Sequence, residues 1–468
     1  MATAPNPLLT ICVPTMDRPG LLEAGLLNLV AEAGPQGGAV EILVTDNGRP
    51  LPGEDPGRRP LEDLIRSVDP AIRYVRVPGA PVVFARSFLF GPTLHARGDY
   101  VWVVGDDDMV IRGAVAQILG FLRENPDLDY VYLNHGWISV EQRNLRNRND
   151  GATMPPDYRG YHSDDMTARR LARMEDIVGL AAVNPYASFS TIFCYVARRR
   201  IYIEHAGVLD FTDDVDECRF NFSAIFPHTH LTMAVLAGRP VGYIGEPCVA
   251  QGSTTADDRA WVYHSMIHGH LRLFEWLGEH TAFDPGTLTR LSSALAEMAG
   301  RLMARIRTRP GDHLGVDNLE RYAVPRLSAF PEYGAGFERE SRNLAGLEDE
   351  ARLLAAEWER WSSSQAPVRA AVWDSMRRGV RLLELAPALA ESVAVAVSLC
   401  AWQPWPHKPG LQPPGVLEKL RPDVLVLAVP RETVPAFLDR AAALLGEITP
   451  VITVAGIYRA GRGSWAPA

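Results

Sequence analysis

Three adjacent aspartates, Asp106, Asp107 and Asp108, follow the apolar run of residues 100–104 after a single glycine. Like charges side by side at the end of a strand repel one another unless a cation or hydrogen-bond donors compensate them. Carboxylate oxygens suit Mg²⁺ and Mn²⁺ better than Zn²⁺, and such ions are commonly held by one or two carboxylates together with phosphate oxygens of a substrate. The run therefore predicts a divalent-metal site, with a solvated acidic turn as the alternative.

Polar residues also stand at the ends of two earlier apolar runs. They are Pro14, Thr15, Asp17 and Arg18 after residues 8–13, and Asp46 and Asn47 after residues 41–45. Taken singly, Asp17 is typical of a helix N-cap and Asp46-Asn47-Gly48 of a turn. Their significance depends on whether the fold brings them close to the three aspartates.

The segments around these residues alternate between strand and helix. Short apolar runs rich in β-branched residues predict buried strands, and leucines repeated on one helical face predict helices. The predicted strands cover residues 8–13, 41–45, 73–77 and 100–104, and the predicted helices cover residues 19–31 and 83–96. This alternation predicts a doubly wound α/β layer, in which ligands bind at the carboxyl ends of the strands. The three groups of polar residues are therefore expected on one rim of the sheet.

The order and spacing of these motifs resemble glycosyltransferase family 2, whose members have the GT-A fold. The resemblance rests on residues 11–18, 42–48 and 96–108, with Gly113 opening the next helix, and it extends over about residues 7–255. In character the sequence is similar to abequosyltransferases, which add deoxysugars to bacterial surface polysaccharides. The resemblance implies a GT-A type α/β domain that binds a nucleotide sugar and transfers the sugar with inversion, using Mn²⁺ or Mg²⁺.

The resemblance also implies roles for individual residues. Pro14, Thr15 and Asp46 would hold the nucleotide base, Asp106 would lie near the ribose, and Asp108 would bind the metal that bridges the diphosphate. The full set expected to bind the donor is Pro14, Thr15, Asp17, Arg18, Asp46, Asn47, Asp106 and Asp107, and the expected metal ligands are Asp106, Asp108 and His228. A divalent cation in this position stabilises the negative charge that builds up as the nucleotide departs.

An inverting transfer needs a general base for the acceptor hydroxyl. The Glu-Asp pair usual in the family is absent, and its place before the apolar helix of residues 231–236 is taken by Phe226-Pro-His-Thr-His230. By resemblance to deoxysugar transferases, His228 is a candidate for the base or for a metal ligand, ahead of His230, with a capping or core histidine as the alternative. The rival candidates for the base are Asp213, Asp214 and Asp216, whose alternative is a solvated acidic loop.

The whole chain is predicted to contain three parts. They are a GT-A catalytic domain at 1–258, a helical segment at 259–365 and a small Rossmann-like α/β domain at 366–468. Within 344–361, apolar residues repeat at heptad spacing, which favours packing onto the segment's own domain over homodimerisation. The last domain is degenerate, because its first turn, Asp374-Ser-Met-Arg-Arg-Gly379, lacks the first two glycines of a dinucleotide-binding motif.

Composition limits the classes of partner and compartment. The 468 residues carry a formal net charge of -9, which argues against a nucleic-acid partner because phosphate binding needs a basic face. The five cysteines are widely spaced, and no apolar run reaches the roughly 20 residues of a membrane-spanning helix. We therefore expect a cytoplasmic protein without disulfides, and peripheral association with the inner face of the cytoplasmic membrane stays open.

These inferences favour an inverting, metal-dependent glycosyltransferase. Its donor would be a nucleoside-diphosphate sugar and its acceptor a saccharide or glycolipid hydroxyl in surface polysaccharide or glycoconjugate synthesis. A nucleotidyltransferase acting on sugar phosphates is the first alternative, but such enzymes usually have a Gly-rich basic phosphate loop near the N-terminus, where this chain offers Arg18. A non-catalytic scaffold that retains the fold is the second alternative, and the intact aspartate run argues against it.

Overall fold

The computed structural model describes residues 6–16, 18–47, 61–76, 94–138, 162–181, 191–209, 226–252, 260–308, 319–363, 370–374, 393–397, 423–428, 451–453, 456–461 and 464–467. These residues form two compact units, the first reaching up to Phe337 and the second beginning at Glu338. The chain is mixed α/β, with a large sheet in the first unit and additional helical segments. The predicted fold class is thereby confirmed, while the domain boundaries after 258 and 365 stay predictions.

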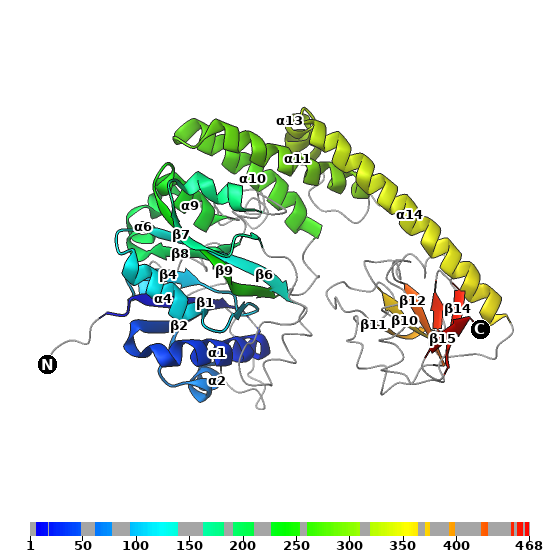
Figure 1. Ribbon diagram of the computed structural model, residues 1–468, viewed down its shortest axis with the longest axis horizontal. Coiled ribbons are helices and arrows are strands. Elements are labelled where there is room, and N and C mark those ends of the chain that lie inside the picture. Colours follow the sequence, from blue (N-terminus) through cyan, green and yellow to red (C-terminus); the bar gives the residue numbers. More distant parts are fainter. Residues whose placement is uncertain are drawn as a thin grey trace. The chain divides into compact units, whose positions relative to one another are not determined.

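The sheet of the first unit is mixed, and its N-terminal half is parallel (Figure 1). Its described strands are β1 (Leu9–Thr15), β2 (Val40–Asp46), β3 (Arg73–Arg76), β4 (Tyr100–Val103), β5 (Met109–Val110), β6 (Tyr130–Ile138), β7 (Ala168–Leu171), β8 (Tyr195–Arg198) and β9 (Val241–Gly252). The order is β3-β2-β1-β4-β8-β6-β9-β5, and β7 also pairs with β9. The first four strands of this order run parallel, and β8 lies antiparallel between β4 and β6.

The register of the parallel strands decides which residues share an edge. β1 is buried along its whole length, as expected for a strand between two parallel neighbours. Leu9 lies opposite Val40 and Tyr100, and Thr15 lies opposite Asp46. The strands β1, β2 and β4 therefore end at the same rim of the sheet. The four strands predicted for this region are confirmed, each within two residues at either end.

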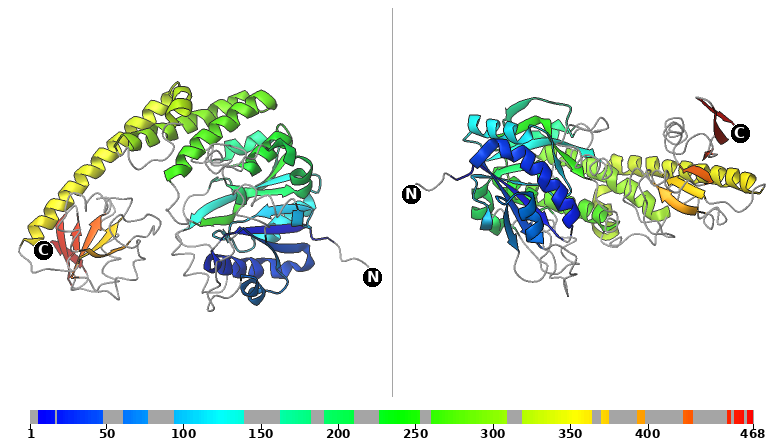
Figure 2. Two further views of the ribbon diagram at one scale, coloured as in Figure 1. Left: turned by 180° about the vertical axis from the view of Figure 1, so that it is seen from behind. Right: turned by 90° about the horizontal axis from the view of Figure 1, so that it is seen from below.

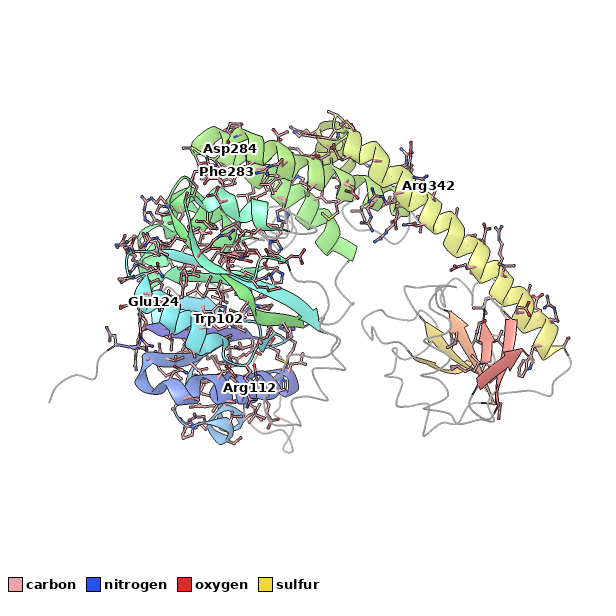
Figure 3. The ribbon with its side chains drawn as sticks, in the orientation of Figure 1. Trp102, Arg112, Glu124, Phe283, Asp284 and Arg342 are labelled. Atoms are coloured by element: carbon pink, nitrogen blue, oxygen red, sulfur yellow. The ribbon has the colours of Figure 1, made fainter. Side chains whose placement is uncertain are left out.

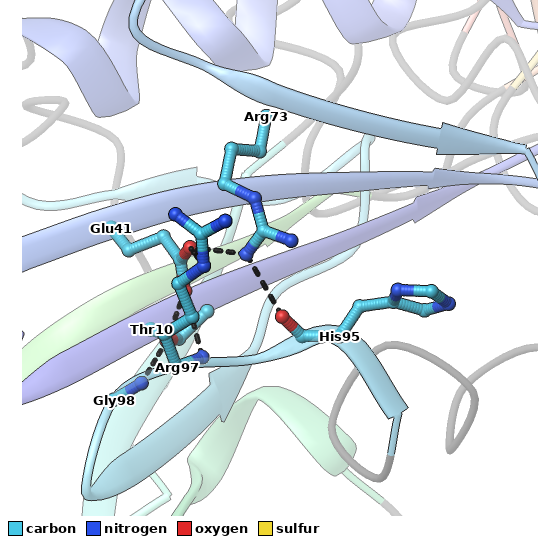
Figure 4. Close-up of polar contacts among 6 residues, drawn as sticks. All are labelled: Thr10, Glu41, Arg73, His95, Arg97 and Gly98. Carbon is cyan, nitrogen blue, oxygen red and sulfur yellow. Dashed lines mark hydrogen bonds and ion pairs between the residues drawn. The ribbon is translucent and has the colours of Figure 1, made fainter. Parts of the chain in front are cut away.

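At the opposite, amino ends of these strands, Glu41 is the centre of a polar network (Figure 4). Its carboxylate forms an ion pair with Arg73, accepts a hydrogen bond of 2.7 Å from the Thr10 hydroxyl, and accepts one of 2.9 Å from the backbone N–H of Arg97. The Arg73 guanidinium also donates to the carbonyl of His95 at 2.8 Å. The network joins the starts of three strands to the segment that leads into β4.

Gly98 allows that segment to approach β1 closely. Its N–H donates to the Thr10 hydroxyl at 2.8 Å. A Cβ atom at this position would lie 2.6 Å from the backbone nitrogen of Thr10, which is too close for any side chain. A glycine is therefore required here for the entry into β4.

The helices described in the first unit are α1 (Pro19–Ala33), α2 (Leu61–Val68), α4 (Ala114–Glu124), α6 (Arg199–Glu204), α9 (Pro227–Leu236), α10 (Ala260–His280), α11 (Pro285–Thr308) and α13 (Val324–Leu327). Shorter turns of helix are η1 (Gly34–Ala39), η3 (Met174–Leu180), η5 (Ile192–Cys194), η6 (Ala206–Val208) and η9 (Leu319–Ala323). α1 contacts β2, β5, α2 and α4, and its course beside the sheet can be followed in Figure 2. α1 confirms the helix predicted at 19–31. Of the helix predicted at 83–96, residues 83–93 lie outside the described part of the chain.

Helices of residues 260–337 belong to the same compact unit as the sheet. At the start of α11, Asp284 (Figure 3) accepts a hydrogen bond of 2.7 Å from the backbone N–H of Thr287. Farther along α11, a Cβ atom on Gly300 would come within 2.0 Å of the carbonyl oxygen of Tyr333, at the start of α14 (Pro331–Ser362). A Cβ atom on Gly336 would likewise lie 2.3 Å from the carbonyl of Glu297. The two glycines therefore allow the backbones of α11 and α14 to touch.

The second unit contains its own sheet. Its described strands are β10 (Ala370–Asp374), β11 (Val393–Val397), β12 (Val424–Ala428), β13 (Val451–Thr453), β14 (Gly456–Gly461) and β15 (Ser464–Pro467). The order is β11-β10-β12-β13-β14-β15, with the first four strands parallel and the last two antiparallel. This parallel core, with the first strand inside it, agrees with the predicted Rossmann-like domain. Residues 375–379, which carry the degenerate glycine motif, lie outside the described residues.

The apolar seam of α14 is largely buried within a single chain. Ala351, Leu354, Trp358 and Trp361 are all buried, whereas Leu353 on another face is 54% exposed. These side chains are buried within a single chain, and both packing of 344–361 onto its own domain and the homodimer stay predictions. Among the helices that the structure describes, none combines the length and the apolar character needed to cross a membrane.

Candidate active site

The structure brings together predicted residues from three strand ends. Thr15 and Asp46 end neighbouring strands opposite each other, and the N–H of Asn47 donates to the carbonyl of Thr15 at 2.9 Å. The Thr15 hydroxyl donates to Oδ2 of Asp106 at 2.7 Å, which joins the end of β1 to the segment after β4. These buried polar side chains therefore lie on one rim. The predicted residues Asp17, Asp213 and Asp214 lie outside the described residues, as does Asp216.

Asp106 is the inner anchor of the acidic segment. It is fully buried, and the hydroxyl of Thr15 and the guanidinium of Arg18 bind different oxygens of its carboxylate. Arg18 also pairs with Asp107 at 3.4 Å. The contacts of Thr15 and Arg18 with Asp106 favour the charged form of its carboxylate, which burial would otherwise penalise. Arg18 thus connects the start of α1 with the first two aspartates.

Gly105 sets the directions of the other two carboxylates. Its N–H donates to Oδ2 of Asp108 at 3.0 Å, and its carbonyl accepts from the N–H of Asp108 at 3.1 Å, which makes a tight turn. A Cβ atom on Gly105 would lie 2.8 Å from an oxygen of Asp107 and 2.8 Å from an oxygen of Asp108. These two oxygens therefore converge above the glycine and are no farther apart than twice that distance.

This pair of carboxylates fits a hard divalent cation. Two converging carboxylate oxygens are the partial ligand set with which proteins typically hold Mg²⁺ or Mn²⁺ beside a phosphate. Within the described ranges, no three or more His, Cys, Asp or Glu side chains are grouped closely enough to form a complete metal site. The remaining positions would thus have to come from water and substrate oxygens, as is usual for Mg²⁺.

Asp46 has a partner that the sequence interpretation missed. The phenol of Tyr74, in β3, donates to Oδ2 of Asp46 at 2.8 Å. Burial, followed by the hydrogen bond to Asp46, raises the pKa of Tyr74, so its hydroxyl remains a donor at neutral pH. Tyr74 also lines a hollow shared with Glu62, Arg66, Pro70 and Ile72. The sequence feature that could have indicated this contact is the tyrosine within the predicted strand of residues 73–77.

His228 lies at the start of α9 in an aromatic environment. Its ring contacts Tyr195 edge-on with centroids 4.9 Å apart, and Phe226 is also near it. Burial, and after it the charge of His270, lowers the pKa of His228 to about 3, so the imidazole is neutral near pH 7. Neither ring nitrogen has a hydrogen-bond partner among the residues that the structure describes. An unpartnered buried imidazole costs free energy, which makes a ligand at this position favourable.

The topology relates His228 to the acidic rim. β8 runs antiparallel to β4 with Val196 opposite Trp102, so Tyr195 lies beside the carboxyl end of β4. Trp102 (Figure 3) is fully buried and donates to the carbonyl of Phe193 at 2.7 Å, which fixes η5 at the same end. His228 therefore packs on a strand end adjacent to the aspartates.

A buried group of polar residues, also missed from the sequence, lies next to this strand end. Sγ of Cys194 is 3.0 Å from Nδ1 of His135, and the His135 ring stacks on His162 with centroids 5.3 Å apart. Burial chiefly raises the pKa of the Cys194 thiol, with a smaller contribution from the charge of Asp108. The thiol is thus protonated at neutral pH, and Asp108 is close enough to affect it.

Comparison with known proteins gives likeness in structure alone. No protein-family model and no curated protein matches the chain. Staphylococcus aureus TarS aligns at 12% identity over 64% of this chain and 44% of that chain, with a TM-score of 0.39. A mannosyltransferase from Pyrobaculum calidifontis, in complex with GDP-Man and Mn²⁺, aligns at 15% identity over 72% of this chain and 85% of that chain, also with a TM-score of 0.39.

A third solved structure is glucosyl-3-phosphoglycerate synthase from Mycobacterium tuberculosis, in complex with Mg²⁺ and uridine diphosphate. It aligns at 11% identity over 60% of this chain and 82% of that chain, with a TM-score of 0.33. The chain spans less than half the length of the TarS structure named above. Similarity at these TM-scores does not by itself assign an activity to this chain.

Proposed function

We propose that the protein is an inverting, metal-dependent glycosyltransferase that moves a sugar from a nucleoside-diphosphate sugar to a hydroxyl of a saccharide or glycolipid acceptor. One observation carries the proposal. Oxygens of Asp107 and Asp108 converge above Gly105 at the end of β4, on the same rim as Thr15 and Asp46. A nucleotide-binding rim and a partial site for a hard cation are the two parts that such a transfer requires.

The contacts on this rim support donor-binding roles for its residues. Asp46, oriented by Tyr74, accepts an N–H of the nucleotide base. Thr15 and Arg18 hold Asp106, which keeps the acidic segment in place against the repulsion of its own charges. A bound Mg²⁺ or Mn²⁺, held by Asp108 and its neighbouring carboxylate, would supply stabilisation of the negative charge on the departing diphosphate.

For His228, the contacts favour a ligand role over that of general base. An imidazole whose pKa is about 3 accepts a proton only at a large cost in free energy, whereas its neutral form binds a metal or donates to a phosphate. The two ring nitrogens, which find no hydrogen-bond partner within the described part of the chain, support the same choice. The general base is then sought at Asp213 or Asp214, which precede α9 in the sequence.

Nucleotide binding and product identity test the proposal. Thermal unfolding of the full chain is measured with UDP, CDP, GDP and dTDP, each with Mn²⁺ or with a chelator. One nucleotide at about 100 times its Kd should stabilise the protein by about 2.7 kcal/mol in the presence of Mn²⁺. The sugar conjugates of that nucleotide are then supplied with candidate saccharide acceptors.

The product separates this proposal from the alternative of a nucleotidyltransferase. Glycosyl transfer from a nucleoside-diphosphate sugar releases the nucleoside diphosphate, whereas nucleotidyl transfer from a nucleoside triphosphate to a sugar phosphate releases pyrophosphate. Stabilisation by none of the four nucleotides would argue for the non-catalytic scaffold. Asp108→Asn provides the control, since its loss of Mn²⁺-dependent stabilisation would tie the effect to this site.

A further inference from the structure

Asn28, in the middle of α1, is a buried amide in a helix whose other buried residues are apolar. Its Nδ2 donates to the carbonyl of Val110 at 3.0 Å, and its Oδ1 accepts from the N–H of Val110 at 2.8 Å. Val110 belongs to the short strand β5, whose other side pairs with β9. The Asn28 amide thus makes with Val110 the two backbone hydrogen bonds that a neighbouring strand would otherwise make.

A second side chain of α1 holds the same segment one helical turn later. Oε2 of Glu32 accepts a hydrogen bond of 2.7 Å from the N–H of Gly113, which has a φ of +84° at the start of α4. Asn28 and Glu32 are four residues apart, so they lie on the same face of the helix. Together with the pairing of Arg18 to Asp106, these contacts fix the acidic segment to α1 along its length.

We propose that Asn28 is a positioning residue for the metal-binding carboxylate, acting through the backbone of Val110. The inference rests on the function proposed above. Val110 is fully buried and follows Asp108 by two residues, so a shift of its backbone is passed on to Asp108 over a very short stretch of chain. Without the amide, the N–H and the carbonyl of Val110 would both be buried without their partner, and the segment would move to satisfy them.

Asn28→Asp tests this with little change in side-chain volume. The carboxylate still accepts from the N–H of Val110 but has no donor for its carbonyl. Asn134→Asp is the matched control, because Asn134 is also fully buried and donates to the carbonyls of Ser163 and Gly245 at 2.9 and 2.7 Å. Both substitutions should lower the melting temperature, since Asn28→Asp removes one buried hydrogen bond and Asn134→Asp removes two.

The distinguishing measurement is the affinity of the folded protein for Mn²⁺ alone, from electron paramagnetic resonance of the free ion. Asn28→Asp should weaken Mn²⁺ binding by about tenfold or more, as substitutions behind a metal ligand commonly do. Asn134→Asp should stay within about twofold of the wild type, because its effect is on stability. Equal affinity in Asn28→Asp and the wild type would overturn the proposal, and so would an equal loss in both variants.

Two further variants distinguish failure of this inference from failure of the proposed metal site. If Asn28→Asp does not fold, Asn28→Ser retains one of the two interactions without adding charge, and it should bind Mn²⁺ about fivefold more weakly. Asp108→Asn tests the metal site itself. Unchanged affinity in Asp108→Asn, or no Mn²⁺ binding by the wild type, would overturn the metal site and the inference with it. Loss in Asp108→Asn with normal affinity in the Asn28 variants would overturn the inference alone.

Discussion

The two ends of the parallel strands hold their carboxylates in different ways. At the amino ends, Glu41 is a single carboxylate bound by Arg73 and Thr10 and by a backbone N–H (Figure 4). At the carboxyl ends, residues 106–108 form a row of three carboxylates, two of which pair with Arg18. One carboxylate surrounded by donors joins segments of the fold. Three in a row create a negative field that a bound cation relieves.

The largest expected effect is a loss of activity on substitution of a carboxylate at the carboxyl ends of the strands. Asp108→Asn removes a charge from the row, so sugar transfer should fall by about 1,000-fold, within the range seen when one electrostatic contact to a transition state is lost. In the absence of metal, the melting temperature should stay the same or rise, because repulsion is relieved. Release of nucleoside diphosphate and thermal unfolding are the two measurements. Near-normal transfer at limiting Mn²⁺ would show that Asp108 does not bind the metal.

Glu41→Gln should have the opposite pattern. It leaves Arg73 beside a neutral amide in a largely buried position, which should lower the free energy of unfolding by about 3 kcal/mol. The kcat of the folded variant for the proposed transfer should remain within about twofold of the wild type. Glu62→Gln, which removes an exposed ion pair with Arg66, is the matched control and should cost less than about 0.5 kcal/mol. A loss of kcat without loss of stability would break the comparison.

Acid unfolding should be governed by buried histidines rather than by either group of carboxylates. Burial lowers the pKa of His162 to about 4, and burial together with His162 lowers that of His135 to about 3, from an ordinary value of 6.5. Between pH 6.5 and 4 the unfolded chain therefore binds more protons than the folded one. The free energy of unfolding should fall as pH falls through this range, by up to about 1.4 kcal/mol per pH unit for each histidine.

His162→Gln tests this assignment through the slope of stability against pH. Urea midpoints measured between pH 7 and pH 5 should decline less steeply in the variant than in the wild type, because one of the titrating groups is gone. Parallel declines would mean that other groups govern acid unfolding.

The smallest expected effect lies at Tyr74 and Asp46, on the side of the rim proposed to bind the nucleotide base. Tyr74→Phe removes one hydrogen bond to Asp46, so affinity for the preferred nucleotide should fall by about fivefold, corresponding to about 1 kcal/mol. The kcat should hardly change, because contacts to a remote base are similar in the ground and transition states. Calorimetric titration of the nucleotide measures the first and steady-state kinetics the second. Unchanged affinity would contradict the proposed role of Asp46 and Tyr74 in binding the donor.

The alternation of strand and helix in the first hundred residues was sufficient to predict the parallel half of the sheet. Apolar runs such as that of β1 are buried between neighbouring strands, and parallel strands end on one rim. The sequence alone was therefore sufficient to group Thr15, Asp46 and Asp106. The antiparallel placement of β8 between β4 and β6 could not be predicted, because strand order depends on long-range pairing that short sequence windows do not contain.

The sequence by itself determined the residue types at the candidate site. They are three consecutive carboxylates after an apolar strand, and polar residues at the ends of two earlier strands. Only the tertiary structure decided how those carboxylates are held. Asn28 reaches Val110, and Tyr74 reaches Asp46, across 82 and 28 positions in the chain. Such contacts depend on the distance between folded elements, and a helix or strand pattern is the same whether or not a side chain finds its partner there.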